Sequence, residues 1–433
     1  MEVIKYPNKE AFSNILVRPE MERGALEMTV VTILETVKND GDAALKTYSK
    51  QFDGVDIENF GVTSDEFEKA INTVPNDLKD KIKIAQKNIE KFHSSQAQPT
   101  QIVETSPGIK CWRRNTPIDR VGLYVPGGST PLFSTLLMLG IPARLAGCQE
   151  IIVCTPPNEQ GSVDSTILYI AQELGIKQLF KIGGAQAIAA MAFGTESVPN
   201  VYKIFGPGNQ YVTVAKQLVQ MEGVAIDMPA GPSEVAIIAD KSANPDFIAS
   251  DLLAQAEHGP DSQVLLVSIE EKLIDQVRDR LLSQLKMIPR REIAEQALQN
   301  SKLVLVKDFD SALELINTYA PEHLILSVSD PHSVSLLVKN AGSVFLGPYT
   351  PESAGDYASG TNHTLPTNRY ARMYSGVSLD SFLKAITFQE ISAKGLQQLG
   401  PVIQKLAEKE KLFAHSLSVT VRLNQLKEKK NDH

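Results

Sequence analysis

Hydrophobic and polar positions along the chain follow two patterns. Residues 21–97 place apolar side chains at helical spacing among many charged ones, which predicts helices exposed on one side. Within this region Thr63 stands three residues before Glu66, the spacing of a capping box that opens a helix. Farther along, short apolar runs such as 120–125 and 150–154 alternate with helical stretches. This alternation is typical of parallel sheets covered by helices on both faces.

The alternation predicts an α/β protein with two Rossmann-like domains whose parallel sheets are incomplete. A helical appendage after such a core often packs on a partner subunit. The expected parts are an N-terminal arm over 1–20, a discontinuous α/β domain from 21–118 and 235–377, a second α/β domain over 119–234, and a helical tail over 378–433.

Composition narrows the class of protein. With 433 residues, of which 42% are hydrophobic and 22% charged, the chain reads as a globular protein of several domains and not as a disordered one. The net charge of 43 − 51 = −8 gives no general attraction to phosphate backbones, so we expect no nucleic-acid partner. Prolines and glycines interrupt the longest uncharged stretch, 121–143, and the N-terminus lacks a signal-peptide core, so we expect a cytoplasmic protein without a membrane segment.

The chain has three cysteines and seven histidines. Three cysteines cannot form an all-thiolate zinc site, and an odd number argues against a disulfide framework. Any metal must therefore rely mainly on histidine, carboxylate or amide ligands.

Three glycine-bearing turns follow predicted strands, at 126–129, 183–186 and 206–209. In parallel sheets such turns carry ligands, and the N–H groups of the helix that follows can bind a phosphate. None is a complete G-x-G-x-x-G motif, since Tyr211 stands where the third glycine of the last turn would be. The three together indicate a phosphate-bearing ligand without distinguishing a dinucleotide from a sugar phosphate. Simple strand-to-helix turns are the alternative.

Polar side chains gather on one face of a predicted helix and in a loop farther along. Asp251, Gln255 and His258 stand at positions i, i+4 and i+7, so they form one stripe. The adjacent residues Glu322 and His323 directly precede an apolar run. Because a carboxylate can activate water and an imidazole exchanges protons near neutral pH, this pair is a candidate acid/base site. An exposed helix face and a solvated loop are the alternatives.

Further candidates lie near the C-terminus. Segment 352–363 is rich in glycines and small hydrogen-bonding residues, which suits a binding loop. Glu410 and His415 are about 140° apart on an ideal helix, so a shared site requires that they straddle it or that the helix bends. A nitrogen and oxygen ligand set acceptable to zinc would come from Gln255, His258, Asp356 and His415. No short-range His-x-x-x-His motif accompanies them, so spacing alone leaves metal binding open.

Several of these segments resemble the signature of the histidinol dehydrogenase family. The matching segments are 226–235, 255–258, 321–323 and 355–363. The turns at 183–187 and 206–209 resemble it as well, and the matches run in order over nearly the whole chain. Ala254 departs from the pattern, in which serine is expected, but it faces another side of the helix than Gln255 does.

The resemblance implies zinc- and NAD-dependent oxidation of L-histidinol to L-histidine through L-histidinal, the last two oxidations of histidine biosynthesis. It implies one zinc per subunit of a homodimer, with NAD bound by domain 119–234 and zinc and substrate by the other α/β domain. The implied zinc ligands are Gln255, His258, Asp356 and, from the other subunit, His415. The implied acid/base residues are Glu322 and His323. The implied substrate contacts are Ser233, Glu410, His323 and the four zinc ligands, and the implied NAD contacts are Tyr124, Gln186 and Asn209.

The residues suit this chemistry. Alcohol oxidation needs a base, for which His323 is the natural candidate, and aldehyde oxidation needs added water, which Glu322 can activate. A covalent route through a cysteine thiohemiacetal is the alternative. Its candidates are Cys111, Cys148 and Cys154; neither of the last two stands beside a histidine or a helix start that would favour a thiolate.

Two other functions use the same residues. A zinc hydrolase would leave the glycine turns unexplained. The other is a non-catalytic protein that binds a ligand between two α/β lobes, in which the Glu322–His323 pair would have no catalytic role.

Overall fold

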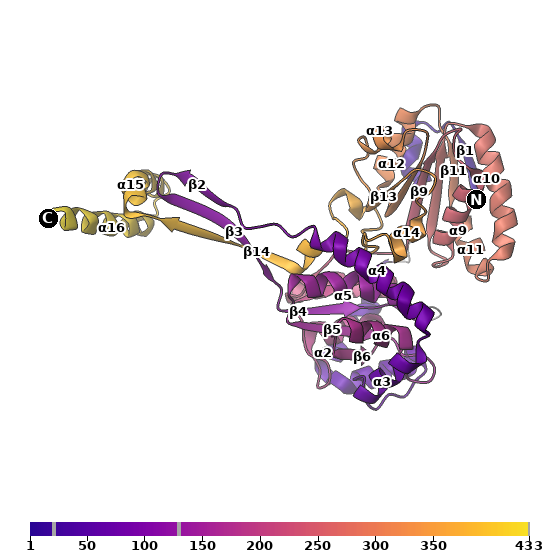
Figure 1. Cartoon of the computed structure of the whole chain (residues 1–433), viewed down its shortest axis with the longest axis horizontal. Coiled ribbons are helices and arrows are strands. Elements are labelled where there is room, and N and C mark those ends of the chain that lie inside the picture. Colours follow the sequence, from indigo (N-terminus) through magenta and orange to yellow (C-terminus); the bar gives the residue numbers. More distant parts are fainter. Residues whose placement is uncertain (20–22, 128–130, 432–433) are drawn as a thin grey trace. The chain divides into compact units, whose positions relative to one another are not determined.

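The chain forms two compact units (Figure 1). A computed structural model describes residues 1–19, 23–127 and 131–431. The first unit comprises Met1–Gln96 and Ile118–Phe382, and the second comprises Ala97–Pro117 and Leu383–His433. Part of the turn 126–129 lies outside the described residues.

One sheet of the first unit has six parallel strands in the order β1-β11-β10-β9-β12-β13. These strands are β1 (Glu2–Lys5), β9 (Glu234–Ala239), β10 (Gln263–Ser268), β11 (Lys302–Leu305), β12 (His323–Ser327) and β13 (Ser343–Leu346). Three central strands, β9, β10 and β12, are buried throughout, as expected for a parallel sheet with helices on both faces. Helices α9 (Pro245–Ala256), α10 (Glu271–Gln284) and α11 (Arg291–Gln299) share one core with this sheet, and α1 (Phe12–Ile15) and α12 (Phe309–Tyr319) share another.

The other sheet of the first unit has five parallel strands in the order β6-β5-β4-β7-β8. Its strands are β4 (Arg120–Tyr124), β5 (Glu150–Thr155), β6 (Gln178–Lys181), β7 (Lys203–Phe205) and β8 (Ala225–Ile226). Its helices are α5 (Phe133–Ala146), α6 (Ser165–Glu173), α7 (Gly184–Phe193) and α8 (Gln210–Val219). The prediction of an α/β fold with two parallel-sheet domains is confirmed.

The early helices pack on the five-stranded sheet. The capping box at Thr63 and Glu66 is present and opens α3 (Ser64–Thr73). Helix α2 (Arg23–Tyr48) contacts α7 and α8, while α3 contacts α6 and α4 (Asn76–Ser94) contacts α5. Region 21–118 was expected to join 235–377, but the apolar faces of these helices are buried in the cores of the other sheet. Helical spacing shows that a helix has an apolar face and not which sheet covers it.

The N-terminal region differs from the arm expected over 1–20. Strand β1 pairs in parallel with β11, and α1 buries Phe12 and Ile15 in the core of the six-stranded sheet. This pairing joins residues about 300 positions apart, which no local pattern reveals.

The second unit is a three-stranded antiparallel sheet followed by two helices. Strands β2 (Ile102–Ser106), β3 (Ile109–Pro117) and β14 (Leu383–Ile391) lie in the order β14-β3-β2, followed by α15 (Ala393–Lys409) and α16 (Phe413–Asn431). The expectation that 378–433 is helical throughout is wrong over β14, where cross-strand pairs such as Phe388 and Trp112, with rings 5.4 Å apart, favour a strand.

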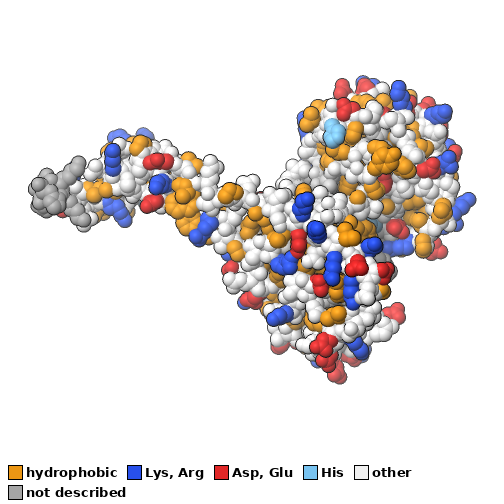
Figure 2. All heavy atoms as spheres, in the orientation of Figure 1, with side chains coloured by type: hydrophobic (Ala, Val, Ile, Leu, Met, Phe, Trp, Pro, Cys, Tyr) orange, Lys and Arg blue, Asp and Glu red, His pale blue; other side chains and the backbone are white. Residues whose placement is uncertain are grey.

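Apolar side chains remain exposed on the second unit (Figure 2). They include Ile102, Val103, Ile386, Leu406, Leu412, Phe413, Leu417 and Val421. Within the part of the chain that the structure describes, no helix is both long and apolar enough to cross a membrane.

Candidate active site

The candidate acid/base residues lie where two neighbouring parallel strands begin. His323 is the first residue of β12 and pairs with Val235 near the start of β9, and Glu322 precedes it. Helix α9 follows β9 and runs back along the sheet, so its C-terminal end returns Gln255 and His258 to this edge. The candidate site therefore lies at the amino ends of the strands, whereas open parallel sheets usually bind ligands at the carboxyl ends.

Glu322 and His323 are both buried and are held by the main chain of Glu234. The Glu234 N–H donates to Glu322 Oε2 at 2.9 Å, and the Glu234 carbonyl oxygen lies 3.2 Å from His323 Nδ1. Because a carbonyl oxygen only accepts, this contact keeps a proton on Nδ1 and leaves Nε2 as the basic nitrogen. Among the described residues, Nε2 makes only a long contact, with Asp356, and no hydrogen bond of good geometry, so it can bond to a substrate.

Two further carboxylates flank the imidazole of His323. Its Nε2 lies 3.5 Å from Asp356 Oδ1, and its Nδ1 lies 3.9 Å from Glu352 Oε1. Glu352 and Asp356 stand four residues apart on the short helix α14 (Glu352–Tyr357), so both face His323. Glu352 is not among the site residues predicted from the sequence. Its spacing from Asp356 was the signal that could have identified it.

Electrostatics in this cluster favour a cation. Burial alone would lower the pKa of His323, but Glu322, Glu352 and Asp356 raise it well above its usual value. Burial raises the pKa of Glu322 and, more strongly, that of Glu352, while His323 opposes both shifts. Burial would also raise the pKa of Asp356, but the hydrogen bond and charge of His323 lower it overall. One imidazole thus sits among three carboxylates, an arrangement that a further positive charge would stabilise.

Gln255, His258 and Asp356 fit a metal ion. Gln255 is fully buried, and within the described part of the chain neither of its amide atoms has a hydrogen-bond partner. A buried amide of this kind is costly unless a ligand completes its bonding. Burial among protein atoms lowers the pKa of His258 overall, although the residue as a whole is exposed, and the nearby charge of Asp356 opposes this shift. A neutral imidazole is the form that binds metals. A second donor set, formed by His323, Glu352 and Asp356, has ligand atoms within 4.8 Å of one another.

His363 holds Asp356 in place. Its Nδ1 lies 2.9 Å from the Asp356 carbonyl oxygen, and its Nε2 lies 3.2 Å from Thr135 Oγ1. Since both ring nitrogens are engaged, His363 supports the end of α14.

The Ser233 carbonyl accepts from Gln263 N–H at 3.1 Å, in the turn that leads into β9. His93, which lies outside this cluster, is buried in α4.

Comparison with known proteins decides the family. The sequence profile of the histidinol dehydrogenase family matches residues 16–423. Histidinol dehydrogenase of Bacteroides thetaiotaomicron is 57% identical over 99% of this chain and 100% of its own length. That of Pectobacterium atrosepticum is 50% identical over 96% of this chain and 93% of its own. The crystal structure of histidinol dehydrogenase from Elizabethkingia anophelis superposes with a TM-score of 0.95, at 52% identity and 99% coverage of both chains.

This chain belongs to the histidinol dehydrogenase family. The resemblance read from the sequence is thereby confirmed, and the cluster around His323 is the candidate active site of an oxidoreductase.

The candidate NAD contacts of this family member lie at the carboxyl edge of the five-stranded sheet. Tyr124 ends β4, and its hydroxyl oxygen accepts from Gly184 N–H at 3.0 Å. Gly206 presses against the Tyr124 carbonyl with a φ of +127°, where a side chain would collide, so only glycine fits this turn. Asn209 caps α8 by accepting from Val212 N–H at 3.0 Å, and Gln186 is buried in α7. Two glycine turns thus contact Tyr124 at the starts of α7 and α8.

Glu410 and His415 belong to the second unit and are exposed there. Helix α15 ends at Lys409 and α16 begins at Phe413, with Lys411 at a φ of +61° between them. The two residues therefore flank a break between helices, which removes the 140° separation expected on one ideal helix.

The cysteines do not suit nucleophilic catalysis. All three are free, and burial raises the pKa of the Cys154 thiol strongly, so its thiolate is disfavoured. Cys148 is partly buried beside Phe382, and Cys111 lies in the second unit.

Proposed function

We propose that this protein oxidises L-histidinol to L-histidine through L-histidinal, transferring two hydrides to two molecules of NAD in succession. The zinc ligands in this proposal are Gln255, His258, Asp356 and His415 of the partner subunit. The observation that carries it is the buried Glu322–His323 pair next to the carboxylate of Asp356, at the edge of the sheet where α9 ends with the unbonded amide of Gln255. The relatives at 57% and 50% identity, named for the oxidation of histidinol, support it.

When bound by these residues, zinc would supply a positive charge for the nitrogen atoms of the substrate and a Lewis acid for its oxygen. Its two imidazoles and one carboxylate are common zinc ligands, and the amide oxygen of Gln255 would complete the set of four. We propose that each subunit binds one zinc ion.

In the first oxidation, His323 Nε2 accepts the hydroxyl proton while the carbinol carbon gives a hydride to NAD. The carboxylates of Glu322, Glu352 and Asp356 favour the cationic imidazole that results, so they make His323 a stronger base. NAD would lie against Tyr124, Gln186 and Asn209 at the carboxyl edge of the five-stranded sheet.

In the second oxidation, Glu322 takes a proton from water as the water oxygen bonds to the aldehyde carbon. The hydrated aldehyde then gives its hydride to a second NAD. The sum is one alcohol, two NAD⁺ and one water converted to one carboxylate, two NADH and three protons. Because burial raises the pKa of Glu322, it is a stronger base than an exposed glutamate, which suits this step.

The substrate contacts in the proposal are Ser233, Glu410 of the partner subunit, His323 and the zinc ligands. Homodimer formation is supported by the apolar side chains exposed on α15, α16 and the three-stranded sheet, since such a surface is usually covered by a partner. Free cysteines are typical of a reducing compartment, which supports a cytoplasmic location.

Removal of the metal should abolish NADH formation from L-histidinol. We expect His258→Ala to lower zinc content from one per subunit and to reduce turnover by at least 100-fold, because the ligand set loses its imidazole. A chelator should have the same effect, and added zinc should restore activity to the chelated wild type. His332→Ala, which removes an exposed histidine on α13 (Pro331–Ser335), is the matched control and should behave as wild type.

Three results would contradict the proposal. They are full activity after complete zinc removal, zinc-dependent turnover without NADH, and tight histidinol binding with no turnover in the zinc-loaded wild type. The second result indicates a hydrolase, and the third indicates a binding protein.

A further inference from the structure

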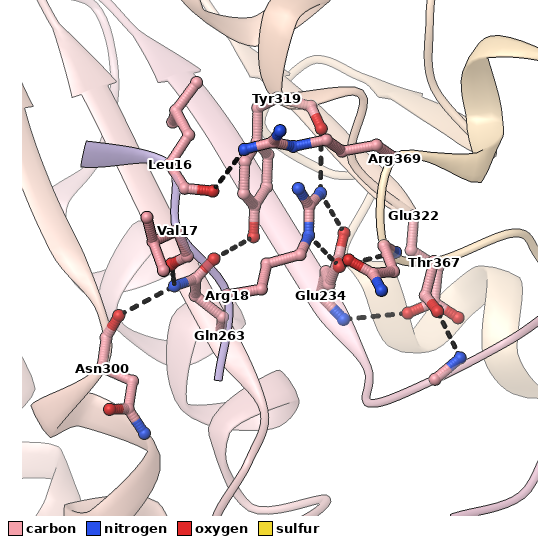
Figure 3. A network of polar contacts seen from close by, with 12 residues as sticks. Leu16, Val17, Arg18, Glu234, Gln263, Asn300, Tyr319, Glu322, Thr367 and Arg369 are labelled. Atoms are coloured by element: carbon pink, nitrogen blue, oxygen red, sulfur yellow. Dashed lines mark hydrogen bonds and ion pairs between the residues drawn. The ribbon is translucent and has the colours of Figure 1, made fainter. Parts of the chain in front are cut away.

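A buried ion pair joins the N-terminal segment to the residue that holds the acid/base pair (Figure 3). The side chains of Arg18 and Glu234 are 5% and 3% exposed. Arg18 Nε donates to Glu234 Oε1, and Arg18 NH2 donates to Glu234 Oε2 at 2.8 Å. The Asn368 N–H also donates to Glu234 Oε1 at 2.8 Å. The side chain of Glu234 is thereby fixed from two directions.

The main chain of the same residue holds both members of the acid/base pair. Glu234 N–H donates to Glu322 Oε2, and its carbonyl oxygen contacts His323 Nδ1. A shift or rotation of the backbone at Glu234 would therefore displace the Glu322 carboxylate. It would at the same time alter the contact that fixes the tautomer of His323.

Arg18 also holds the segment that leads into the second strand. Its NH2 group donates to the Tyr319 carbonyl at 2.8 Å, and its guanidinium lies 4.1 Å from the centre of the Tyr319 ring. Tyr319 ends α12, and Ala320 follows with a φ of +52°, just before Glu322. One guanidinium thus ties the start of β9 to the connection that enters β12.

We propose that Arg18 is a positioning residue for the Glu322–His323 pair. It acts through Glu234 and Tyr319, and so sets the distance between the two strand starts that carry the acid/base groups. This inference rests on the proposed function.

A role in stability alone does not account for this geometry. A buried ion pair contributes little net stability compared with apolar residues of similar size, because both charges lose their hydration. The N-terminal segment is also held independently, by the pairing of β1 with β11 and by the burial of Phe12 and Leu16. The bidentate contact instead fixes orientation, which a planar guanidinium does well.

The experiment compares steady-state kinetics of the zinc-loaded wild type, Arg18→Met and Arg18→Lys with L-histidinol and NAD. We expect Arg18→Met to lower kcat by about 10- to 100-fold, the size expected for a misplaced catalytic group, with each KM within about twofold of wild type. Zinc content should be unchanged. Arg18→Lys keeps the charge but cannot make the bidentate contact with the Glu234 carboxylate. Its kcat should therefore still be lower than that of the wild type, by a smaller factor than in Arg18→Met.

Millimolar guanidinium should raise the kcat of Arg18→Met and leave Arg18→Lys unchanged. A cavity of about 260 Å³ borders Arg18, Glu234 and Gln263, so the small cation can reach the space left by the truncated side chain. Lys302→Met is the matched control, since it removes the 2.7 Å ion pair with Glu2 that attaches the same N-terminal segment on β11, two strands away from β9. It should keep the wild-type kcat.

The outcomes distinguish the positioning role of Arg18 from the proposed function of the protein. Wild-type kcat in Arg18→Met and Arg18→Lys, with only a lower Tm, would overturn the positioning role and leave the proposed function intact. A rise in KM at unchanged kcat would do the same. If Arg18→Met does not fold, the kcat of Arg18→Lys decides. An inactive wild type would instead overturn the proposed function.

Discussion

Glu322→Gln is expected to stop the reaction after the first oxidation, so that each L-histidinol yields one NADH in place of two. Glutamine keeps the oxygen that accepts from Glu234 N–H at 2.9 Å, so the local structure should survive. It cannot take a proton from water, and the hydration of the aldehyde loses its base. General-base catalysis contributes about 10²–10⁴-fold, and we expect the second step to slow by that factor. End-point NADH and recovered histidinal measure both effects.

The pH dependence of the second step provides a further check in the wild-type enzyme. Burial raises the pKa of Glu322, so its ionised form is lost at a higher pH than that of an exposed glutamate. The rate of the second step should therefore fall as the pH drops through this raised value. Glu222→Gln, on an exposed glutamate paired with Lys38, is the control and should keep two NADH per histidinol. Two NADH per turnover in Glu322→Gln at the wild-type rate would exclude Glu322 as the base.

Mixed dimers of two inactive variants should regain activity. In the proposal each site takes Glu322 from one subunit and His415 from its partner. A dimer that pairs a His415→Ala subunit with a Glu322→Gln subunit then has one intact site and one site that lacks both groups. After random reassortment of equal amounts, half of the dimers are mixed, so about a quarter of the wild-type rate for the complete oxidation should return.

Each homodimer supplies the baseline for this comparison. His415→Ala alone should lose NADH formation, since a zinc ligand is missing, and Glu322→Gln alone should lose the second NADH. No gain in histidine formation after mixing, with mixed dimers demonstrated by differently tagged subunits, would mean that the site is not shared. Full activity of His415→Ala alone would remove this residue from the ligand set.

Much of the fold could be predicted from local pattern. The apolar run at the centre of β12, 324–326, is buried on both faces of a parallel sheet, where hydrophobic residues follow one another without alternation. The capping box at Thr63 was equally visible, because it depends on two residues three positions apart. Both features are local.

Features that depend on distant pairing were not visible. Strand β14 is stabilised by its partner β3, about 270 residues earlier in the chain, so its own pattern was taken for a helix. The covering of the five-stranded sheet by helices from 23–94 likewise depends on which sheet presents a matching apolar face. The spacing of residues in the sequence shows neither the partner strand of β14 nor the sheet that these helices cover.

The candidate site likewise combines residues that a local pattern places together with residues that only distant contacts bring together. Gln255 and His258 could be placed together because one helical turn separates them. Glu352, which lies 3.9 Å from His323, was overlooked because the segment around it read as a loop. Arg18 and Glu234 lie 216 residues apart, and only the folded sheet brings them to the acid/base pair.

In the proposed function, one site carries out both oxidations of L-histidinol. The most direct measurement is the amount of NADH formed when limiting L-histidinol is consumed completely by the zinc-loaded wild type in ¹⁸O-labelled water. We expect two NADH per histidinol and one labelled oxygen in the histidine carboxylate, because the second oxygen atom comes from water. One NADH per histidinol with histidinal as the product, or histidine without the label, would contradict the proposed function.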